Sequence, residues 1–211
     1  MLTLFASSIP ESRVTRRNWV QLAYFLFLCI GVAALVYAAY AALSAINYQK
    51  MSRTAFEHPV EPQPPHIVGT RVPAAGEVIG ELQIPRLGID VMVAQGVSAS
   101  VLSRAVGHMP ETPLPGQLGN AALAGHRDTF FRGLRKIGPG DSVILNTAYG
   151  PLHYEVESIR IVAPGDVSVL DSVGGRTLTL ISCYPFYYVG PAPKRFIVRA
   201  RQIGSLAIGS E

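Results

Sequence analysis

The sequence predicts a mainly β domain that follows a single transmembrane helix. Seven short β-like runs, separated by Gly and Pro, occupy the C-terminal part of the 211-residue chain. Near the N-terminus lies an uncharged apolar run of 25 residues. Charged residues make up only 15% of the chain, below the roughly 25% of an ordinary soluble domain, which also indicates a membrane segment. Apolar residues reach 49%, which excludes an intrinsically disordered chain.

The predicted membrane segment runs from Leu22 to Ile46. As a helix it would span about 37 Å, enough for a hydrocarbon core of about 30 Å. Trp19, Tyr24 and Tyr48 suit the two membrane interfaces. Three arginines precede the run and two basic residues follow it, which favours a cytoplasmic N-terminus. A cleaved signal peptide is the alternative, although its apolar region usually has only about 7–15 residues.

These features divide the chain into four predicted segments. A cytoplasmic segment (1–21) precedes the transmembrane anchor (22–46), a Pro-rich stalk (47–75) and a folded domain (76–211). We expect the 61–66 part of the stalk to be extended, because proline fixes φ and favours polyproline II. The folded domain is long enough to form a core of its own.

The sequence of the folded domain predicts many short strands and a few short helices. Apolar runs predict strands near 80–84, 89–95, 121–124, 142–146, 153–162, 177–183 and 196–201. Two short helices fit between them, at 98–106 with Ser98 as N-cap and at 129–137, where apolar residues recur at helical spacing. This pattern is typical of a β-barrel or a β-sandwich.

The net charge of +4 gives no indication of a nucleic-acid partner. Residues 1–75 hold six basic and three acidic residues, whereas residues 76–211 hold twelve basic and eleven acidic ones. The folded domain is therefore almost neutral, without the basic excess that binding to nucleic acid requires. No two histidines have the helical spacing of metal ligands, so no metal is expected.

Cys183 is the candidate nucleophile. It ends the predicted strand 177–183 and precedes Tyr184, so that its thiol would be fixed at the end of a strand. A free cysteine is often a small buried hydrophobic residue. In an exported domain, however, single thiols are unusual because they tend to be paired or lost. The other cysteine, Cys29, lies inside the membrane segment and cannot contribute.

Two further side chains suit a cysteine enzyme. His126 follows a short apolar strand and is a candidate general acid or base for a cysteine thiolate. His108 competes for this role, and Asp128 could orient a histidine. Arg195 lies twelve residues after Cys183 and opens the last strand, where a guanidinium could stabilise an oxyanion. The alternative for each of these residues is an ordinary surface side chain.

Together the three residues resemble the catalytic set of sortases, the cysteine transpeptidases that attach proteins to bacterial cell envelopes. The run Thr179–Cys183, TLISC, resembles the sortase signature TLxTC. His126 in NAALAGHRDTFF and Arg195 in APKRFIV resemble the sortase catalytic histidine and arginine. The segments GHRDTFFRGLRKI and CYPFYYVGPAPKRFIVRA look most like class D sortases, and the resemblance covers roughly residues 77–203. Ser182 departs from the usual Thr, keeping the hydroxyl and losing a methyl, which bears on pocket packing and substrate preference.

The resemblance implies a closed β-barrel of about eight strands and a cofactor-free mechanism. Cys183 would attack the Thr–Gly amide of an LPxTG-like signal, His126 would protonate the leaving amine, and Arg195 would steady the oxyanion. Leu180 and Ser182 would help to shape the substrate site. An amine of peptidoglycan or of a pilin lysine, or more slowly water, would resolve the thioacyl enzyme. No calcium site is expected, and the domain would lie on the outer face of the membrane.

The sequence supports three other functions less well. L,D-transpeptidases carry an arginine close after the cysteine, whereas Arg195 is the first arginine after Cys183 here. Papain-type proteases place the cysteine before the histidine, which is the reverse of the order in this chain. A membrane-tethered binding or scaffold domain without activity is the alternative from a different class, and it would be indicated by an unreactive Cys183.

Overall fold

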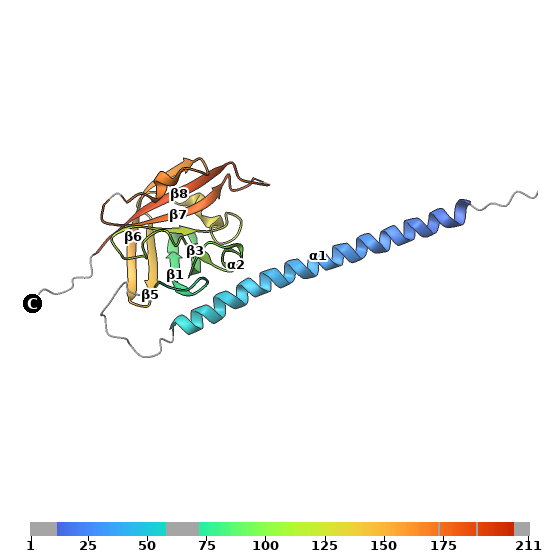
Figure 1. Cartoon of the computed structure of the whole chain (residues 1–211), viewed down its shortest axis with the longest axis horizontal. Helices are drawn as coiled ribbons and strands as arrows, with labels where there is room; N and C mark the ends of the chain where they lie inside the picture. Colours follow the sequence, from blue (N-terminus) through green and yellow to red (C-terminus); the bar gives the residue numbers. More distant parts are fainter. Residues whose placement is uncertain (1–11, 58–71, 173, 189, 205–211) are drawn as a thin grey trace, which may run out of the picture. The chain divides into compact units, whose positions relative to one another are not determined.

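The predicted membrane segment lies within one long helix. The structure is a computed structural model that describes residues 12–57, 72–172, 174–188 and 190–204 (Figure 1). Helix α1 spans Ser12–Glu57, and its part from Asn18 to Thr54 is long and apolar enough to cross a membrane. The helix continues eleven residues beyond Ile46, so the first part of the predicted stalk is helical. The stalk segment 61–66 lies outside the described residues, and the four segment boundaries remain a prediction.

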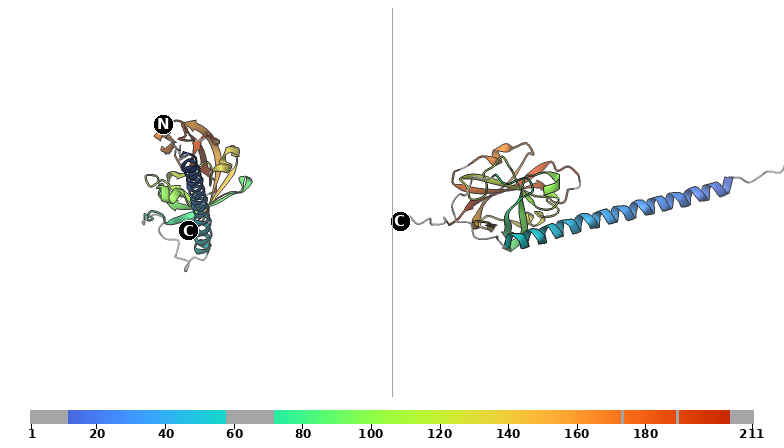
Figure 2. Two further views of the ribbon diagram at one scale, coloured as in Figure 1. Left: turned by 90° about the vertical axis from the view of Figure 1, so that its right-hand side faces the viewer. Right: turned by 60° about the horizontal axis from the view of Figure 1, so that its bottom comes forward.

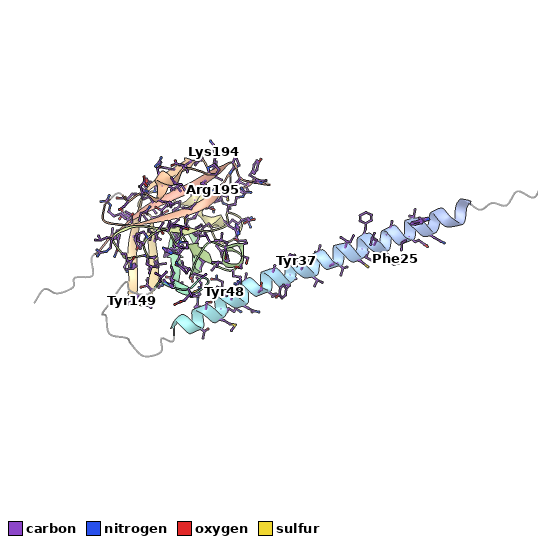
Figure 3. The ribbon with its side chains drawn as sticks, in the orientation of Figure 1. Phe25, Tyr37, Tyr48, Tyr149, Lys194 and Arg195 are labelled. Carbon is purple, nitrogen blue, oxygen red and sulfur yellow. The ribbon has the colours of Figure 1, made fainter. Side chains whose placement is uncertain are left out.

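The apolar side chains of α1 project outwards along its length. Figure 3 shows Phe25 and Tyr37 pointing away from the helix axis, and both are exposed. A helix that is apolar on all sides needs lipid or protein around it. Its length and composition therefore make α1 a candidate anchor or signal.

The C-terminal unit of the chain, Ala45–Glu211, contains a closed β-barrel (Figures 1 and 2). Its strands are β1 (Val78–Ile84), β2 (Ile89–Gln95), β3 (Val106–His108), β4 (Gly119–Ala124), β5 (Ser142–Thr147), β6 (Gly150–Val162), β7 (Arg176–Tyr184) and β8 (Lys194–Gln202). They are joined in the order β1-β2-β3-β4-β7-β8-β6-β5, and β5 closes the barrel by pairing with β1. The pairs β2–β3 and β4–β7 are parallel, and the others are antiparallel. The predicted closed barrel of about eight strands is confirmed.

All seven predicted strands are present, but two predicted helices are shorter than expected. The helix predicted at 98–106 is only the single turn α2 (Ala99–Leu102), capped as predicted by Ser98, whose hydroxyl accepts from the Val101 amide at 3.4 Å. The rest of that segment leads into β3, which is too short to show a periodic pattern. The helix predicted at 129–137 contains the 3-10 turn η2 (Arg132–Lys136). Two further 3-10 turns are η1 (Pro85–Leu87) and η3 (Val167–Leu170).

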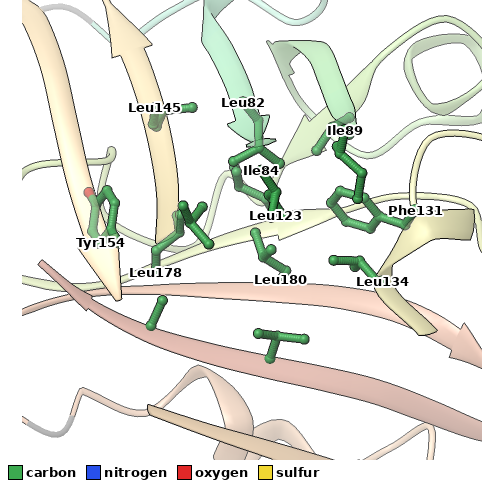
Figure 4. Close-up of a cluster of buried hydrophobic side chains, with 14 of the residues drawn as sticks. Leu82, Ile84, Ile89, Leu123, Phe131, Leu134, Leu145, Tyr154, Leu178 and Leu180 are labelled. Carbon is green, nitrogen blue, oxygen red and sulfur yellow. The ribbon is translucent and has the colours of Figure 1, made fainter. Parts of the chain in front are cut away.

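The barrel interior is filled by the inward-facing residues of the strands (Figure 4). Because side chains alternate between the two faces of a strand, every second residue of β7 enters the core, as Leu178 and Leu180 do. Segment η2 and the turn before it add Leu134 and Phe131 to the same cluster. Among the described residues, this cluster is the largest of three buried hydrophobic clusters, and it fixes the barrel that carries the candidate site.

Truncation of a core leucine should destabilise the barrel. Leu82 is fully buried, so Leu82→Ala is expected to lower the free energy of unfolding by about 3 kcal/mol through lost burial and a residual cavity. Leu118 is 73% exposed, and Leu118→Ala should change this free energy by less than about 0.5 kcal/mol. Thermal unfolding followed by near-ultraviolet circular dichroism would measure both, and equal losses would contradict this assignment of the core.

Candidate active site

The order of the strands brings the three candidate residues to one edge of the barrel. β7 lies between β4 and β8, parallel to the first and antiparallel to the second. The C-terminal ends of β4 and β7 therefore lie beside the N-terminal start of β8. His126 follows β4, Cys183 ends β7 and Arg195 begins β8, so residues far apart in sequence become neighbours in the sheet.

Cys183 and Arg195 form a directly opposed cross-strand pair. In such a pair both side chains point to the same face of the sheet, with Cβ atoms about 4.5–5.5 Å apart. Cys183 carries a free thiol and is half-buried, as is Arg195. The Nη1 atom of Arg195 donates to the carbonyls of Ala192 and Lys194, at 3.3 Å and 3.1 Å. Figure 3 labels Arg195 and Lys194 on β8.

His126 is brought to this pair by the β4–β7 register. Ala124 is paired with Ile181, and the Gly125 amide donates to the Ile181 carbonyl at 3.0 Å. Two residues beyond the Ala124–Ile181 pair, the chain reaches His126 on one side and Cys183 on the other. His126 has an exposed side chain, and its carbonyl accepts from the Phe131 amide at 3.0 Å.

A buried polar cluster fixes this parallel pair. The side-chain oxygen of Asn120 accepts from the hydroxyls of Thr177 and Thr179, at 3.2 Å and 2.7 Å. Its amide nitrogen donates to the carbonyl of Val169 in η3 at 3.0 Å. All three polar side chains are buried, so a shift of register would leave them without partners at a cost of about 1–3 kcal/mol each. Asn120 thus ties β4 to β7 and to the segment that covers them.

An apolar groove lies on the outer face of these strands. It has a volume of about 230 Å³, and eleven of its thirteen lining residues are apolar. Ile181 and Ile197 form part of its floor on β7 and β8, while Val167 and Leu170 line it from the η3 segment. Arg195 is a lining residue as well, so the groove reaches the residue that lies opposite Cys183. An extended apolar peptide could bind here with a backbone carbonyl near the thiol.

Leu180 and Ser182 lie beneath the site and are not open to a peptide. Leu180 is 0% exposed and belongs to the barrel core. Ser182 is 2% exposed, and its hydroxyl donates to the Gly125 carbonyl at 3.1 Å. Both residues can therefore shape the site only from below. Leu180 does so through the core, and Ser182 holds the end of β4 next to His126.

His108 occupies a structural position on β3. Its ring is buried, with Nδ1 at 2.8 Å from the Gln95 side-chain oxygen and Nε2 at 2.9 Å from the Pro113 carbonyl. Burial lowers the pKa of His108, and the Pro113 carbonyl and Glu111 oppose this shift. Both ring nitrogens are engaged, so His108 does not compete with His126. Asp128 is exposed, and no hydrogen bond joins it to His126 in the described part of the chain.

The sequence did not predict two features of the site. One is the η3 segment that covers the groove, and the other is the contact of Arg127 with the loop between β7 and β8. The connection between β6 and β7 contains the run APGDVSVL, whose apolar residues beside Gly and Pro could have marked it as more than a surface loop. Arg127 donates through Nη2 to the carbonyls of Tyr188 and Gly190, at 2.6 Å and 3.0 Å. No local signal predicts that contact. Among the described residues, no group of three or more His, Cys, Asp or Glu side chains could hold a metal ion.

Comparisons with known proteins agree with this geometry. A sortase domain model matches residues 82–203. Sortase D of Bacillus subtilis (strain 168) is 36% identical over 132 residues, which cover 62% of this chain and 67% of that protein. Sortase SrtE1 of Streptomyces coelicolor is 37% identical over 139 residues, which cover 56% of this chain and 40% of SrtE1.

The solved structures that resemble this chain are also sortases. The Clostridium perfringens Sortase D5 transpeptidase superposes with a TM-score of 0.63 at 26% identity, covering 75% of this chain and 97% of that one. Sortase E1 from Streptomyces coelicolor, with a tripeptide in its active site, superposes with a TM-score of 0.57 at 34% identity, covering 63% and 92%. The resemblance predicted from the three motifs, class D sortases included, is confirmed.

Adding a methyl group at Gly125 should disturb the end of β4. A Cβ atom there would lie 2.7–2.9 Å from the buried ring of Phe131, which must then move. Gly125→Ala is expected to destabilise the protein by about 1–3 kcal/mol and to shift the NMR signals of the His126 imidazole. Gly138→Ala is the matched control, since its Cβ would meet nothing closer than 4.0 Å. Equal thermal midpoints in the two variants would contradict the crowding at Gly125.

The burial of His108 should make stability depend on pH. The pKa of His108 is lower in the folded protein than in the unfolded chain, where it is about 6.5. The contribution of neutral His108 to the free energy of unfolding is therefore fully present above a pH of about 6.5. The contribution is lost as the pH falls from about 6.5 towards the folded pKa, since protonation then favours the unfolded chain. In His108→Gln, the thermal midpoint should fall less steeply over this range than in the wild type. Identical slopes would show that His108 is not held neutral.

Proposed function

Since the chain belongs to the sortase family of cysteine transpeptidases, we propose that it cleaves an LPxTG-like sorting signal through a thioacyl intermediate on Cys183. The observation that supports this assignment most directly is the opposed Cys183–Arg195 pair at the end of an apolar groove. His126 follows the strand that runs parallel to the cysteine strand. Nucleophile, acid/base and charge stabiliser would thus come from three adjacent strands.

In the first half of the reaction, the Cys183 thiol passes its proton to His126, and the sulfur attacks the carbonyl carbon of the Thr–Gly amide. A carbon–sulfur bond forms, and the carbonyl oxygen takes up negative charge. Arg195 is suited to stabilise this oxyanion because its guanidinium is permanently charged and lies on the same face of the sheet as the thiol. The carbon–nitrogen bond then breaks as His126 gives a proton to the leaving amine.

In the second half, an amine attacks the thioacyl carbon and Cys183 is released as the leaving group. His126 accepts the proton that the amine loses, and the product is a new amide. We propose an amine of peptidoglycan or of a pilin lysine as this nucleophile, with water as the slower alternative. No step of this scheme needs a cofactor, because all the groups it uses are side chains of the protein.

The groove is suited to the Leu-Pro part of the signal. Its apolar lining from β7, β8 and the η3 segment would bury these side chains away from water. Arg195 at the groove would then lie near the backbone of the threonine that follows. A pocket of about 230 Å³ has room for a short part of the signal only.

We further propose that α1 anchors the enzyme in the cytoplasmic membrane. The helix has the length and composition of a membrane span. Basic residues flanking the apolar run favour a cytoplasmic N-terminus, which would leave the barrel on the outer face. Exported proteins that carry a sorting signal would reach the enzyme there.

Intact-mass spectrometry of the detergent-solubilised chain tests the proposed reaction. With a panel of LPxTG-like peptides, the wild type should gain the mass of the acyl half of a peptide, and Cys183→Ala should gain nothing. Arg195→Lys keeps the charge but loses the planar guanidinium, and kcat/KM should fall by about 10²–10³-fold. Lys194→Gln is the matched control, because Lys194 is the exposed neighbour on the same strand and should be close to wild type.

Three outcomes would contradict parts of the proposal. An adduct on Cys183→Ala would remove Cys183 as the nucleophile. Full activity of Arg195→Lys would remove the guanidinium from the mechanism. The absence of any adduct, together with an unreactive Cys183 thiol, would favour the non-catalytic binding domain.

A further inference from the structure

The connection between β7 and β8 joins two proposed catalytic residues, Cys183 and Arg195. Its described residues are 185–188 and 190–193, and all of them are exposed or half-buried. Tyr187 is 76% exposed, so packing alone does not hold this loop in place. Within it, the Tyr188 amide donates to the Pro185 carbonyl at 3.3 Å.

Two arginines hold the backbone of this loop. Arg127 donates to the carbonyls of Tyr188 and Gly190 in the loop, and Arg195 donates to the carbonyl of Ala192 in the loop and to that of its neighbour Lys194 at the start of β8. Three of these four carbonyls belong to the loop. Hydrogen bonds from a charged donor are stronger than those between neutral groups, so these contacts can order an exposed loop.

Arg127 also links this loop to the strand end that carries His126. It is the residue directly after His126, it is half-buried, and its guanidinium carbon lies 5.9 Å from the centroid of the Tyr188 ring. Its Nη1 atom is buried without a hydrogen-bond partner, so its position is set by the Nη2 bonds and by the ring. A displacement of the loop would therefore act directly on the backbone next to His126.

We propose that Arg127 is a positioning residue, which locks the β7–β8 loop to the histidine segment and thereby sets the geometry of His126 and Arg195 on either side of Cys183. The effect of Arg127 on turnover rests on the proposed function. Its effect on the loop does not depend on that function. Without Arg127, the carbonyls of Tyr188 and Gly190 lose their donor, and of the two arginines only Arg195 still binds the loop backbone.

A matched control is provided by Arg135. Its guanidinium carbon lies 5.2 Å from the ring centroid of Tyr187 in the same loop, but it donates no hydrogen bond to a described loop carbonyl. Arg135→Ala therefore removes the same charge and a similar ring contact while it leaves the loop backbone bonded. Any difference in loop exchange or turnover between Arg127→Ala and Arg135→Ala is then due to the hydrogen bonds from Arg127 to the loop carbonyls.

Hydrogen exchange and kinetics on the full chain in detergent test this proposal. In Arg127→Ala, amides of residues 186–194 should exchange at least tenfold faster, whereas those of Leu178 and Leu180 on β7 should not change. kcat for an LPxTG-like peptide should fall at least tenfold. At alkaline pH, where a cysteine ionises without a histidine partner, alkylation of Cys183 by iodoacetamide should change less than twofold. Arg135→Ala should resemble the wild type in all three measurements.

Arg127→Lys guards against a variant that fails to fold, since it keeps the charge and should give intermediate exchange rates. Unchanged loop exchange in Arg127→Ala, or equal acceleration in Arg135→Ala, would overturn the proposal. Faster exchange with unchanged kcat would overturn the positioning role, because the loop would then be free without consequence for the site. If the wild type forms no adduct with any peptide and its Cys183 thiol is unreactive, the proposed function fails, and the exchange data still decide whether Arg127 holds the loop.

Discussion

The arrangement of the site depends on the place of β7 between a parallel and an antiparallel neighbour. Parallel pairing with β4 puts Cys183 at the level of His126, the second residue after that strand, and antiparallel pairing with β8 puts Arg195 directly opposite Cys183. Because side chains alternate along a strand, a slip of one residue would turn the thiol into the core and Leu180 outwards. Register is therefore as important to the proposed chemistry as the identity of the three side chains.

Register in this region is held by polar groups as well as by the core. Asn120 accepts from two threonine hydroxyls on β7 and donates to the η3 carbonyl of Val169, all in a buried setting. Arg199 donates to the same Val169 carbonyl at 2.8 Å from the outer side of β8. A single carbonyl on the segment that covers the groove is thus bound from two strands. The groove wall and the edge that carries the proposed catalytic residues are consequently joined in one hydrogen-bonded unit.

Local patterns in the sequence predict the strands and the candidate residues at their ends, because these features depend on neighbouring residues. They do not predict contacts between residues that are distant in the sequence. Alternating apolar runs mark the long strands, and residues at strand ends mark Cys183, His126 and Arg195 as candidates. The three-residue strand β3 has no pattern of its own, so its segment resembles the end of a helix. The sequence could not predict the bonds from Arg127, because its partners lie more than sixty residues away. The burial of His108 depends likewise on Gln95 and Pro113, which only the folded barrel brings to its ring.

The small groove and the long apolar helix have complementary roles under the proposed function. A groove of about 230 Å³ contacts only a short part of a peptide, so binding of a free peptide should be weak. A substrate held in the same membrane meets the enzyme at an effective concentration of the order of millimolar, which compensates for weak intrinsic affinity. Discrimination can then come from the fit of the signal between the groove and the Cys183–Arg195 pair. Tight binding is not needed, and rapid release of the cleaved segment follows from the same weak contacts.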